Sequence, residues 1–151
     1  LARLFEVQPA WGAAASAHYR EQAALGAALP AARLAEIDAQ VQALRRAAAA
    51  LFERIDVIVT PATAALPWPA EEAYPSRIAG QAAGPRDHAA FTWWANVAGL
   101  PAIALPCRPS REGLPIGLQL VGAAGSDDLL LALAAQFEQL QPWSGRWPEI
   151  A

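Results

Sequence analysis

One segment, residues 91–122, constrains the fold of this chain more than any other. Glycine and proline stand in it where a backbone must turn or end an element: Gly99, Pro101, Pro106, Gly113, Pro115 and Gly117. The order of apolar runs between them predicts the end of a helix, a buried strand at 101–106, a polar turn and another strand at 116–121. Because residues 108–115 form so short a connection, we expect these two strands to pair antiparallel.

The residues before this segment predict helices that lead into a further strand. A first helix is expected from Trp11 to Leu25, and a stronger one opens at Pro30. Apolar residues recur in the second helix at three- and four-residue steps as far as Ile55, so we expect one of its faces to pack against a sheet. The β-branched run Asp56–Pro61 is typical of a strand covered on both faces. This order predicts an α/β fold class, with a mixed β-sheet flanked by α-helices.

Taken together, these elements predict one domain over residues 1–151, with a helical segment (1–55) and an α/β segment (56–151). Residues 66–85 are expected to form an irregular loop with one short turn of helix. Asp87 is a candidate N-cap for a helix that runs to Ala98.

The C-terminal part predicts a last helix that begins at Ser126, with acidic residues in its first turn, where the helix dipole favours negative charge. Leu129–Leu140 is apolar almost all round, so we expect it to be deeply packed. A tail with Trp143 and Trp147 follows.

Composition excludes several functions. The formal net charge of −3 argues against a nucleic-acid partner. There is no apolar run long enough to span a membrane and no signal-peptide pattern at the start, so we expect a cytoplasmic location. Cys107 is the single cysteine, and it is expected to be a small buried apolar residue. His18 and His88 lack ligand spacing, so no metal or cofactor is predicted.

Four segments together resemble the C-terminal part of the amidase signature family. They are DVIVTPAT at 56–63, NVAGLPAIALPC at 96–107, GLPIGLQLVG at 113–122, and the helix at 127–138 with the tail at 143–148. Their order and spacing agree with the family over roughly the last two-thirds of the chain, whereas any one of them would be a weak motif.

The resemblance implies a partial, C-terminal amidase signature fold and an enzyme that hydrolyses carbon–nitrogen bonds of small carboxamides. Such enzymes use a serine nucleophile, a second serine in a cis peptide and a lysine base, because a serine hydroxyl attacks only when a base takes its proton. This chain has no lysine, since all eleven basic residues are arginine, and no Gly-Ser-Ser-Gly sequence. We therefore assign no catalytic residue and expect the chain alone to be inactive, contributing scaffold and part of the substrate pocket.

Candidate substrate-binding residues follow from their position at strand ends. Thr60 and Thr63 flank Pro61, where the first strand opens into a loop. Strand ends of this kind are frequent ligand sites in α/β folds, but both threonines are equally explained as caps of the turn. The amide of Asn96, just before the helix stop, is explained as well by a bond to the loop backbone as by one to substrate.

Aromatic residues of the predicted 87–98 helix are the other candidates. Phe91, Trp93 and Trp94 suit a pocket wall for an apolar acyl or aryl group, although aromatic residues on such a helix more often belong to the core. Gln119 stands among leucines and valine in a strand, where a buried amide needs partners. We interpret it as structural.

Other functions stay open. Within the same family, the chain also fits the A-type subunit that supplies ammonia in tRNA-dependent amidotransferases, or an allophanate-type hydrolase. A different class of function is a non-catalytic binding or assembly module built on the same sheet.

The resemblance also predicts self-association. A fragment of the family's sheet lacks neighbouring strands, so uncovered sheet edges and apolar helix faces are expected to recruit another chain.

Overall fold

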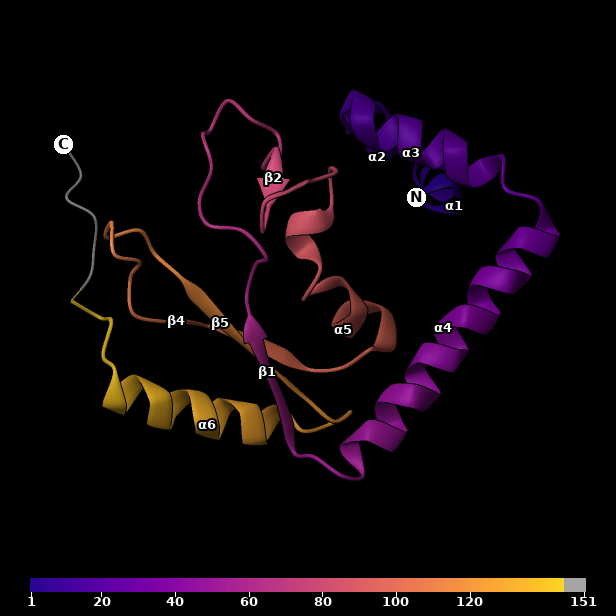
Figure 1. Cartoon of the computed structure of the whole chain (residues 1–151). Coiled ribbons are helices and arrows are strands. Elements are labelled where there is room, and N and C mark those ends of the chain that lie inside the picture. The colour runs from indigo at the N-terminus through magenta and orange to yellow at the C-terminus, as the bar shows by residue number, and fades with distance from the viewer. Residues whose placement is uncertain (146–151) are drawn as a thin grey trace. The chain divides into compact units, whose positions relative to one another are not determined.

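The computed structural model describes residues 1–145, and the chain divides into two compact units, Leu1–Val41 and Gln42–Ala151 (Figure 1). The division falls inside a long helix, α4 (Ala31–Phe52). The first unit is helical, and the second holds the sheet and its covering helices.

The first unit contains three short helices before α4: α1 (Ala2–Val7), α2 (Pro9–Ala14) and α3 (Ala17–Ala27). The single helix predicted from Trp11 to Leu25 is therefore wrong. The chain leaves the helical conformation at Ala15, where φ is −66° and ψ is 148°, and Ser16 then starts α3.

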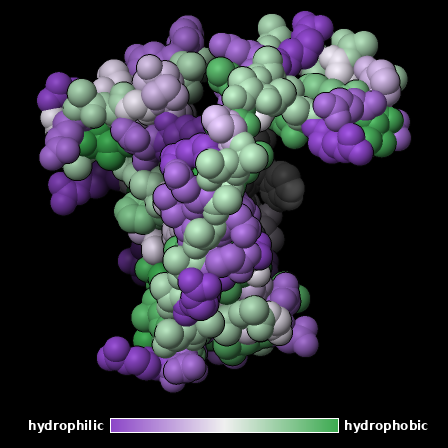
Figure 2. Space-filling model, turned by 90° about the vertical axis from the view of Figure 1, so that its right-hand side faces the viewer, coloured by the Kyte–Doolittle hydropathy of each residue, from purple (hydrophilic) through white to green (hydrophobic). Residues whose placement is uncertain are grey.

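Helix α4 begins right after Pro30, as its sequence predicts. Within this helix, all of which the structure describes, only Ala48 is buried. Leu34 and Leu51 remain 51% and 43% exposed, so the expectation that the apolar face packs on a sheet is wrong for this chain. Hydrophobic and hydrophilic surface is exposed along α4 in the view of Figure 2.

The sheet of the second unit has three strands, in the order β1 (Val57–Pro61), β5 (Gly117–Gly122) and β4 (Ala102–Pro106). Both pairings are antiparallel, and they place Gln119 of β5 opposite Thr60 of β1. The predicted antiparallel pairing of β4 with β5 is confirmed, as is the α/β class. Between the described strands of this sheet, the pairing is antiparallel throughout.

The last helix, α6 (Asp127–Leu140), lies against β4 and β5 (Figure 1). Side chains alternate across β5, so that Leu118 and Leu120 face α6 while Gln119 and Val121 point to the other face. A buried cluster lies on the α6 side, with Trp143 packed against it through Phe137 at a ring-centroid distance of 6.4 Å. Its buried members are Leu105, Leu120, Leu130 and Ala134.

Burial differs from the expectations for three of these elements. β1 and β4 are the outer strands of the sheet, and they are only half covered: Val59 of β1 is 59% exposed. The helix α6 is buried along one side and not all round, because Leu131 and Leu140 are 59% and 82% exposed. Only the central strand β5 is covered on both faces along most of its length.

The segment between β1 and β4 is less regular than predicted. In place of one helix from Asp87 to Ala98, it forms a 3-10 turn, η1 (Asp87–Ala89), and a separate helix, α5 (Trp93–Ala98). The Asp87 carboxylate accepts a hydrogen bond from the Gly84 amide at 2.7 Å, so it closes the preceding loop instead of capping a long helix.

The end of α5 matches its prediction. Gly99 is left-handed, with φ 72° and ψ 38°. Its amide donates to the Asn96 carbonyl, and the next amide, of Leu100, donates to the Ala95 carbonyl at 3.0 Å. These two bonds form a Schellman motif, which glycine allows because it has no Cβ to clash.

The irregular loop predicted at residues 66–85 contains a small hairpin that the sequence analysis did not predict. Strands β2 (Arg77–Ile78) and β3 (Gln81–Ala82) pair antiparallel around Ala79 and Gly80. Both turn residues have positive φ, 48° and 79°, which defines a type I′ turn. The predicted turn of helix is therefore replaced by a hairpin.

At the C-terminal side, Ser126 is the N-cap residue of α6, and Asp127 and Asp128 lie in the first turn as predicted. The Ser126 hydroxyl, however, donates to the Ala123 carbonyl at 2.8 Å and does not cap the helix amides. Trp147 of the predicted tail lies outside the described residues. Within residues 1–145, no helix has the length and apolar character needed to cross a membrane, and no cluster of side chains suits a metal ion.

Candidate functional site

A buried amide connects β1 to the segment before α5. Gln119 is 5% exposed, and its Nε2 atom donates to Thr60 Oγ1 at 3.1 Å and to the Phe91 carbonyl at 2.7 Å. Since Thr60 and Gln119 are opposite one another in the β1–β5 register, the side chain reaches both partners from the middle strand. The structure therefore brings Thr60 and Phe91 together.

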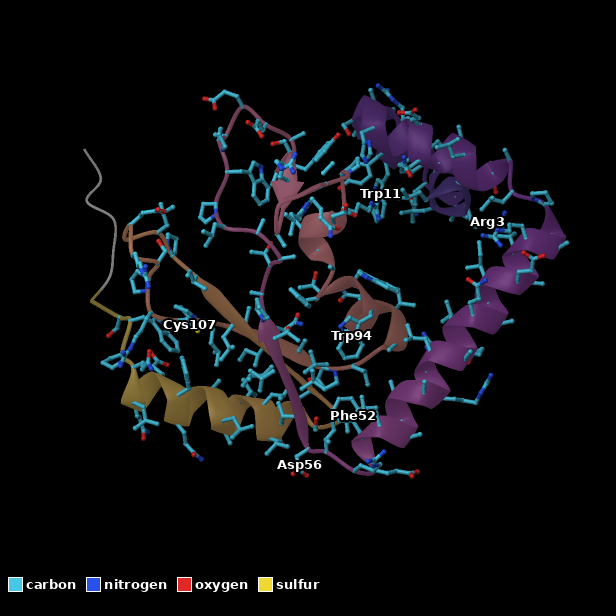
Figure 3. All side chains as sticks on the ribbon, viewed as in Figure 1. Arg3, Trp11, Phe52, Asp56, Trp94 and Cys107 are labelled. Atoms are coloured by element: carbon cyan, nitrogen blue, oxygen red, sulfur yellow. The ribbon has the colours of Figure 1, made fainter. Side chains whose placement is uncertain are left out.

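Trp94 joins the same network. Its indole Nε1 donates to the Phe91 carbonyl at 3.0 Å, so this one oxygen accepts two hydrogen bonds. The side chain is half-buried on α5 (Figure 3). Phe91 contributes to this network through its backbone carbonyl.

A second set of hydrogen bonds lies at the start of the loop after β1. Thr63 Oγ1 and the Ala64 amide both donate to the His88 carbonyl, each at 2.9 Å. The His88 ring packs on Trp68 with a centroid distance of 5.2 Å. Among the described residues, His88 Nδ1 is the buried side-chain nitrogen that has no hydrogen-bond partner.

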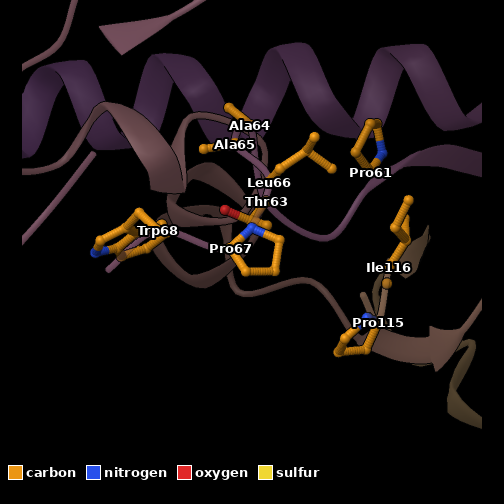
Figure 4. Close-up of a pocket in the computed structure, with 10 residues that line it drawn as sticks. Pro61, Thr63, Ala64, Ala65, Leu66, Pro67, Trp68, Pro115 and Ile116 are labelled. Atoms are coloured by element: carbon orange, nitrogen blue, oxygen red, sulfur yellow. The ribbon is translucent and has the colours of Figure 1, made fainter. Parts of the chain in front are cut away.

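A cleft of about 390 Å³ opens where β1 ends (Figure 4). Pro115 and Ile116 stand on one side of it, and Pro67 and Trp68 on the other. Of the described residues that line it, none is charged, so the cleft suits an apolar group. The lining consists of Pro61, Thr63, Ala64, Ala65, Leu66, Pro67, Trp68, Pro115, Ile116 and Gly117.

The cleft separates the predicted site residues into two groups. Thr63 lines the cleft, whereas Thr60, Phe91 and Trp94 do not line it and belong to the hydrogen-bonded network around Gln119. Asn96 is exposed, and its carbonyl accepts the Gly99 amide at the end of α5.

Sequence reasoning missed the residues that make most of the cleft, in particular Trp68 and Ile116. The signal for Trp68 was its position between two prolines, Pro67 and Pro69, in a loop that otherwise reads as irregular surface. The role of Ile116 depends on the pairing of distant segments. The Ala62 amide donates to the Gly117 carbonyl at 2.9 Å, which joins the two walls.

These features define a class of protein. A sheet covered by a helix, with an apolar cleft at the end of a strand, places the protein in the α/β class, and clefts of this kind are common ligand sites. The apolar cleft is suited to holding a ligand. No side chain with a titratable acid or base group is among the described residues that line the cleft.

Residues 12–131 match the family model described as Amidase, and the chain therefore belongs to the amidase family. The match begins in α2 and ends in α6, so it includes both compact units. This agrees with the family resemblance that the sequence motifs carry.

Individual relatives point to the same family. The chain is 52% identical over 61 residues to the 6-aminohexanoate-cyclic-dimer hydrolase of Pseudomonas sp. (strain NK87), which covers 40% of this chain and 12% of the hydrolase. It is 38% identical over 103 residues to the A-type subunit of the glutamyl-tRNA(Gln) amidotransferase of a Cyanothece species, covering 67% of this chain and 20% of that protein.

Solved structures show the same fold. A crystal structure of an amidase superposes with a TM-score of 0.78 at 27% identity, covering 92% of this chain and 32% of that one. The structure of 6-aminohexanoate cyclic dimer hydrolase complexed with substrate gives a TM-score of 0.73 at 29% identity, covering 85% of this chain and 28% of the hydrolase. The chain thus spans less than a third of the length of these relatives.

Proposed function

We propose that this chain is the C-terminal part of an amidase that hydrolyses carbon–nitrogen bonds of small carboxamides. The observation that carries the proposal is the family match over residues 12–131, which includes residues of both compact units. The cleft at the end of β1 is then part of the substrate pocket, and the network around Gln119 is part of the scaffold that supports it.

The 151 residues alone do not perform the reaction. Without a lysine, they lack the base that the family's serine chemistry needs. The nucleophile and the base are then supplied by residues outside this sequence. Incubation of the purified chain with hexanamide is expected to release no ammonia, and measurable release would overturn this part of the proposal.

The gene supplies the test of the enzyme itself. The coding sequence upstream of Leu1 should specify a lysine and, further along, a Gly-Gly-Ser-Ser-Gly-Gly type of loop. The polypeptide that begins at that lysine-containing segment should release ammonia from carboxamides. An upstream sequence without these residues would remove the amidase proposal and favour the non-catalytic binding or assembly module.

The cleft is expected to take an apolar part of the substrate. Its lining is almost entirely apolar, and its volume of about 390 Å³ is sufficient for a short alkyl chain. Titration of the chain with hexanamide, followed by NMR, should shift the resonances of Trp68 and Ile116. Trp68→Ala should weaken this binding, whereas Trp93→Ala provides a matched control because Trp93 is 54% exposed and does not line the cleft.

A second candidate is the A-type subunit of an amidotransferase. It is favoured by the 38% identity to that component of the glutamyl-tRNA(Gln) amidotransferase, which extends over a larger share of this chain than the identity to the cyclic-dimer hydrolase does. The two candidates differ in substrate. Ammonia release from glutamine but not from hexanamide, measured with the same longer polypeptide, would decide for the amidotransferase.

We also propose that the isolated chain self-associates and that it acts in the cytoplasm. Support for self-association comes from the apolar side chains that stay exposed: Val59 on the outer strand β1, and Leu131 and Leu140 on α6. Uncovered apolar faces and an outer strand tend to recruit another chain. Sedimentation at increasing concentration is expected to show dimers or larger species, and a monomer at every concentration would contradict it.

A further inference from the structure

The Gln119 side chain uses its whole donor capacity on two segments that lie far apart in the sequence. A side-chain amide has two N–H donors, and the bonds to Thr60 Oγ1 and to the Phe91 carbonyl occupy both. At 5% exposure, an unpaired donor here would have no water to bind. The Phe91 carbonyl is thereby held at a fixed place relative to β1 and β5.

The wall of the cleft is bonded to His88, three residues before Phe91 in the same segment. The His88 carbonyl accepts hydrogen bonds from Thr63 Oγ1 and the Ala64 amide. The His88 ring packs on Trp68. Three residues that line the cleft therefore contact His88, and the position of His88 sets the position of the wall.

The segment from His88 to Trp94 contains the end of η1 and the start of α5, and only residues 90–92 between them lie outside a helix. Between η1 and α5 it is kept by local bonds, such as that from Thr92 Oγ1 to the Ala89 carbonyl at 3.1 Å. A short irregular segment depends on its tertiary bonds for its position. The hydrogen bond from Gln119 to the Phe91 carbonyl is a tertiary bond of this kind, and Gln119 belongs to β5, the middle strand of the sheet.

We propose that Gln119 is a positioning residue for the substrate cleft. By holding the Phe91 carbonyl against the sheet, it fixes the segment 88–94, and through His88 it fixes the wall formed by Thr63, Ala64 and Trp68. The inference rests on the proposed function in one respect, that the cleft binds a carboxamide. The anchoring itself is a property of the chain.

The test replaces Gln119 by methionine, which has a similar length and no N–H donors. In Gln119→Met, backbone hydrogen exchange should increase in residues 88–98 and 62–68, while the amides shared by β4 and β5 keep their protection. Hexanamide should bind about tenfold more weakly, as expected for the loss of a buried hydrogen bond that holds a site in place. Gln139→Met is the matched control, because Gln139 is exposed on α6.

Two results would overturn the inference. One is unchanged exchange in residues 88–98 of Gln119→Met. The other is a rise in exchange of the same size throughout the sheet, which a purely structural role would produce. If the variant does not fold, hydrogen exchange of side-chain NH₂ groups in the unmodified chain provides the test. The Gln119 NH₂ protons should exchange far more slowly than those of Gln139, and equal rates would refute the anchoring.

The two proposals can fail separately. If hexanamide does not bind to the unmodified chain, the proposed function of the cleft is wrong, while the exchange measurements still decide whether Gln119 anchors the segment. If hexanamide binds with the same affinity to Gln119→Met and to the unmodified chain, the cleft proposal survives and the positioning role is refuted.

Discussion

The two compact units of the chain contain similar kinds of apolar residues, but they bury them very differently. In Leu1–Val41, the buried residue is Ala23, while Leu34 and Ile37 are exposed. In the second unit, Val121 is 0% exposed and Leu130 is 2% exposed. The difference follows from the strands, whose pairing brings apolar side chains from distant segments onto common faces. A helix with an apolar face buries it only where a second surface meets it.

The strongest test of this contrast is a charge placed in the sheet. Val121→Asp should cost at least about 4 kcal/mol of stability, because the carboxylate would lie where no water reaches it. Near-UV circular dichroism and NMR dispersion should show the second unit unfolded. Val59→Asp on the outer strand is the control, and it should change stability by no more than about 0.5 kcal/mol. A folded Val121→Asp chain would contradict the burial seen at β5.

Two neighbouring leucines of α6 offer the next largest effect. Leu130→Ala should lower the free energy of unfolding by about 2–4 kcal/mol, because the truncated side chain leaves a cavity in the buried cluster. Leu131→Ala, at a residue that is 59% exposed, should cost less than about 1 kcal/mol. Urea denaturation of both variants measures the difference. Equal losses would mean that α6 does not present the face described here to the sheet.

A pair of glycines compares the two units directly. Gly99→Ala should destabilise the second unit by about 1–2 kcal/mol, since alanine in the left-handed conformation brings its Cβ too close to the following carbonyl. Gly26→Ala in α3 should stabilise the first unit by up to about 1 kcal/mol, because an added Cβ meets nothing within 4 Å there. Thermal unfolding checks both signs, and a stabilising Gly99→Ala would refute the left-handed cap.

The smallest effect is expected at an ion pair in the first unit. On α4, Arg33 Nη1 lies 2.8 Å from Glu36 Oε2, and the two side chains are 52% and 62% exposed. Glu36→Gln should reduce stability by no more than about 0.5 kcal/mol, because exposed ion pairs are weak. The effect should vanish in high salt, as measured by helical circular dichroism. A larger, salt-independent loss would show that Glu36 has a role beyond the pair.

The strand β4 and the end of α5 were within reach of sequence reasoning because proline and glycine mark them locally. Pro101 and Pro106 bracket β4, and Gly99 ends α5 in the left-handed conformation that it predicts. These features depend on the residue itself and its immediate neighbours. They therefore do not depend on the tertiary contacts that the rest of the chain makes.

The break in the predicted 87–98 helix and the cleft were out of reach. The Phe91 carbonyl accepts its hydrogen bond from Gln119, 28 positions along the chain. The cleft likewise depends on Gly117 meeting Ala62. No local periodicity encodes such a contact, so the sequence predicted a regular helix and an irregular loop where the structure has a turn, a hairpin and one wall of the cleft.

The order of strands in the sheet has a consequence for how the chain folds. β5 is the last strand along the sequence, yet it lies between β1 and β4, and it pairs Thr60 with a residue 59 positions later. On a growing polypeptide, the edge of β1 that pairs with β5 stays open until β5 has been made. Closing such a long loop slows folding, and until then this edge of Val57–Pro61 is open to pairing with other chains. The yield of correctly folded protein will therefore depend on how fast the chain is completed.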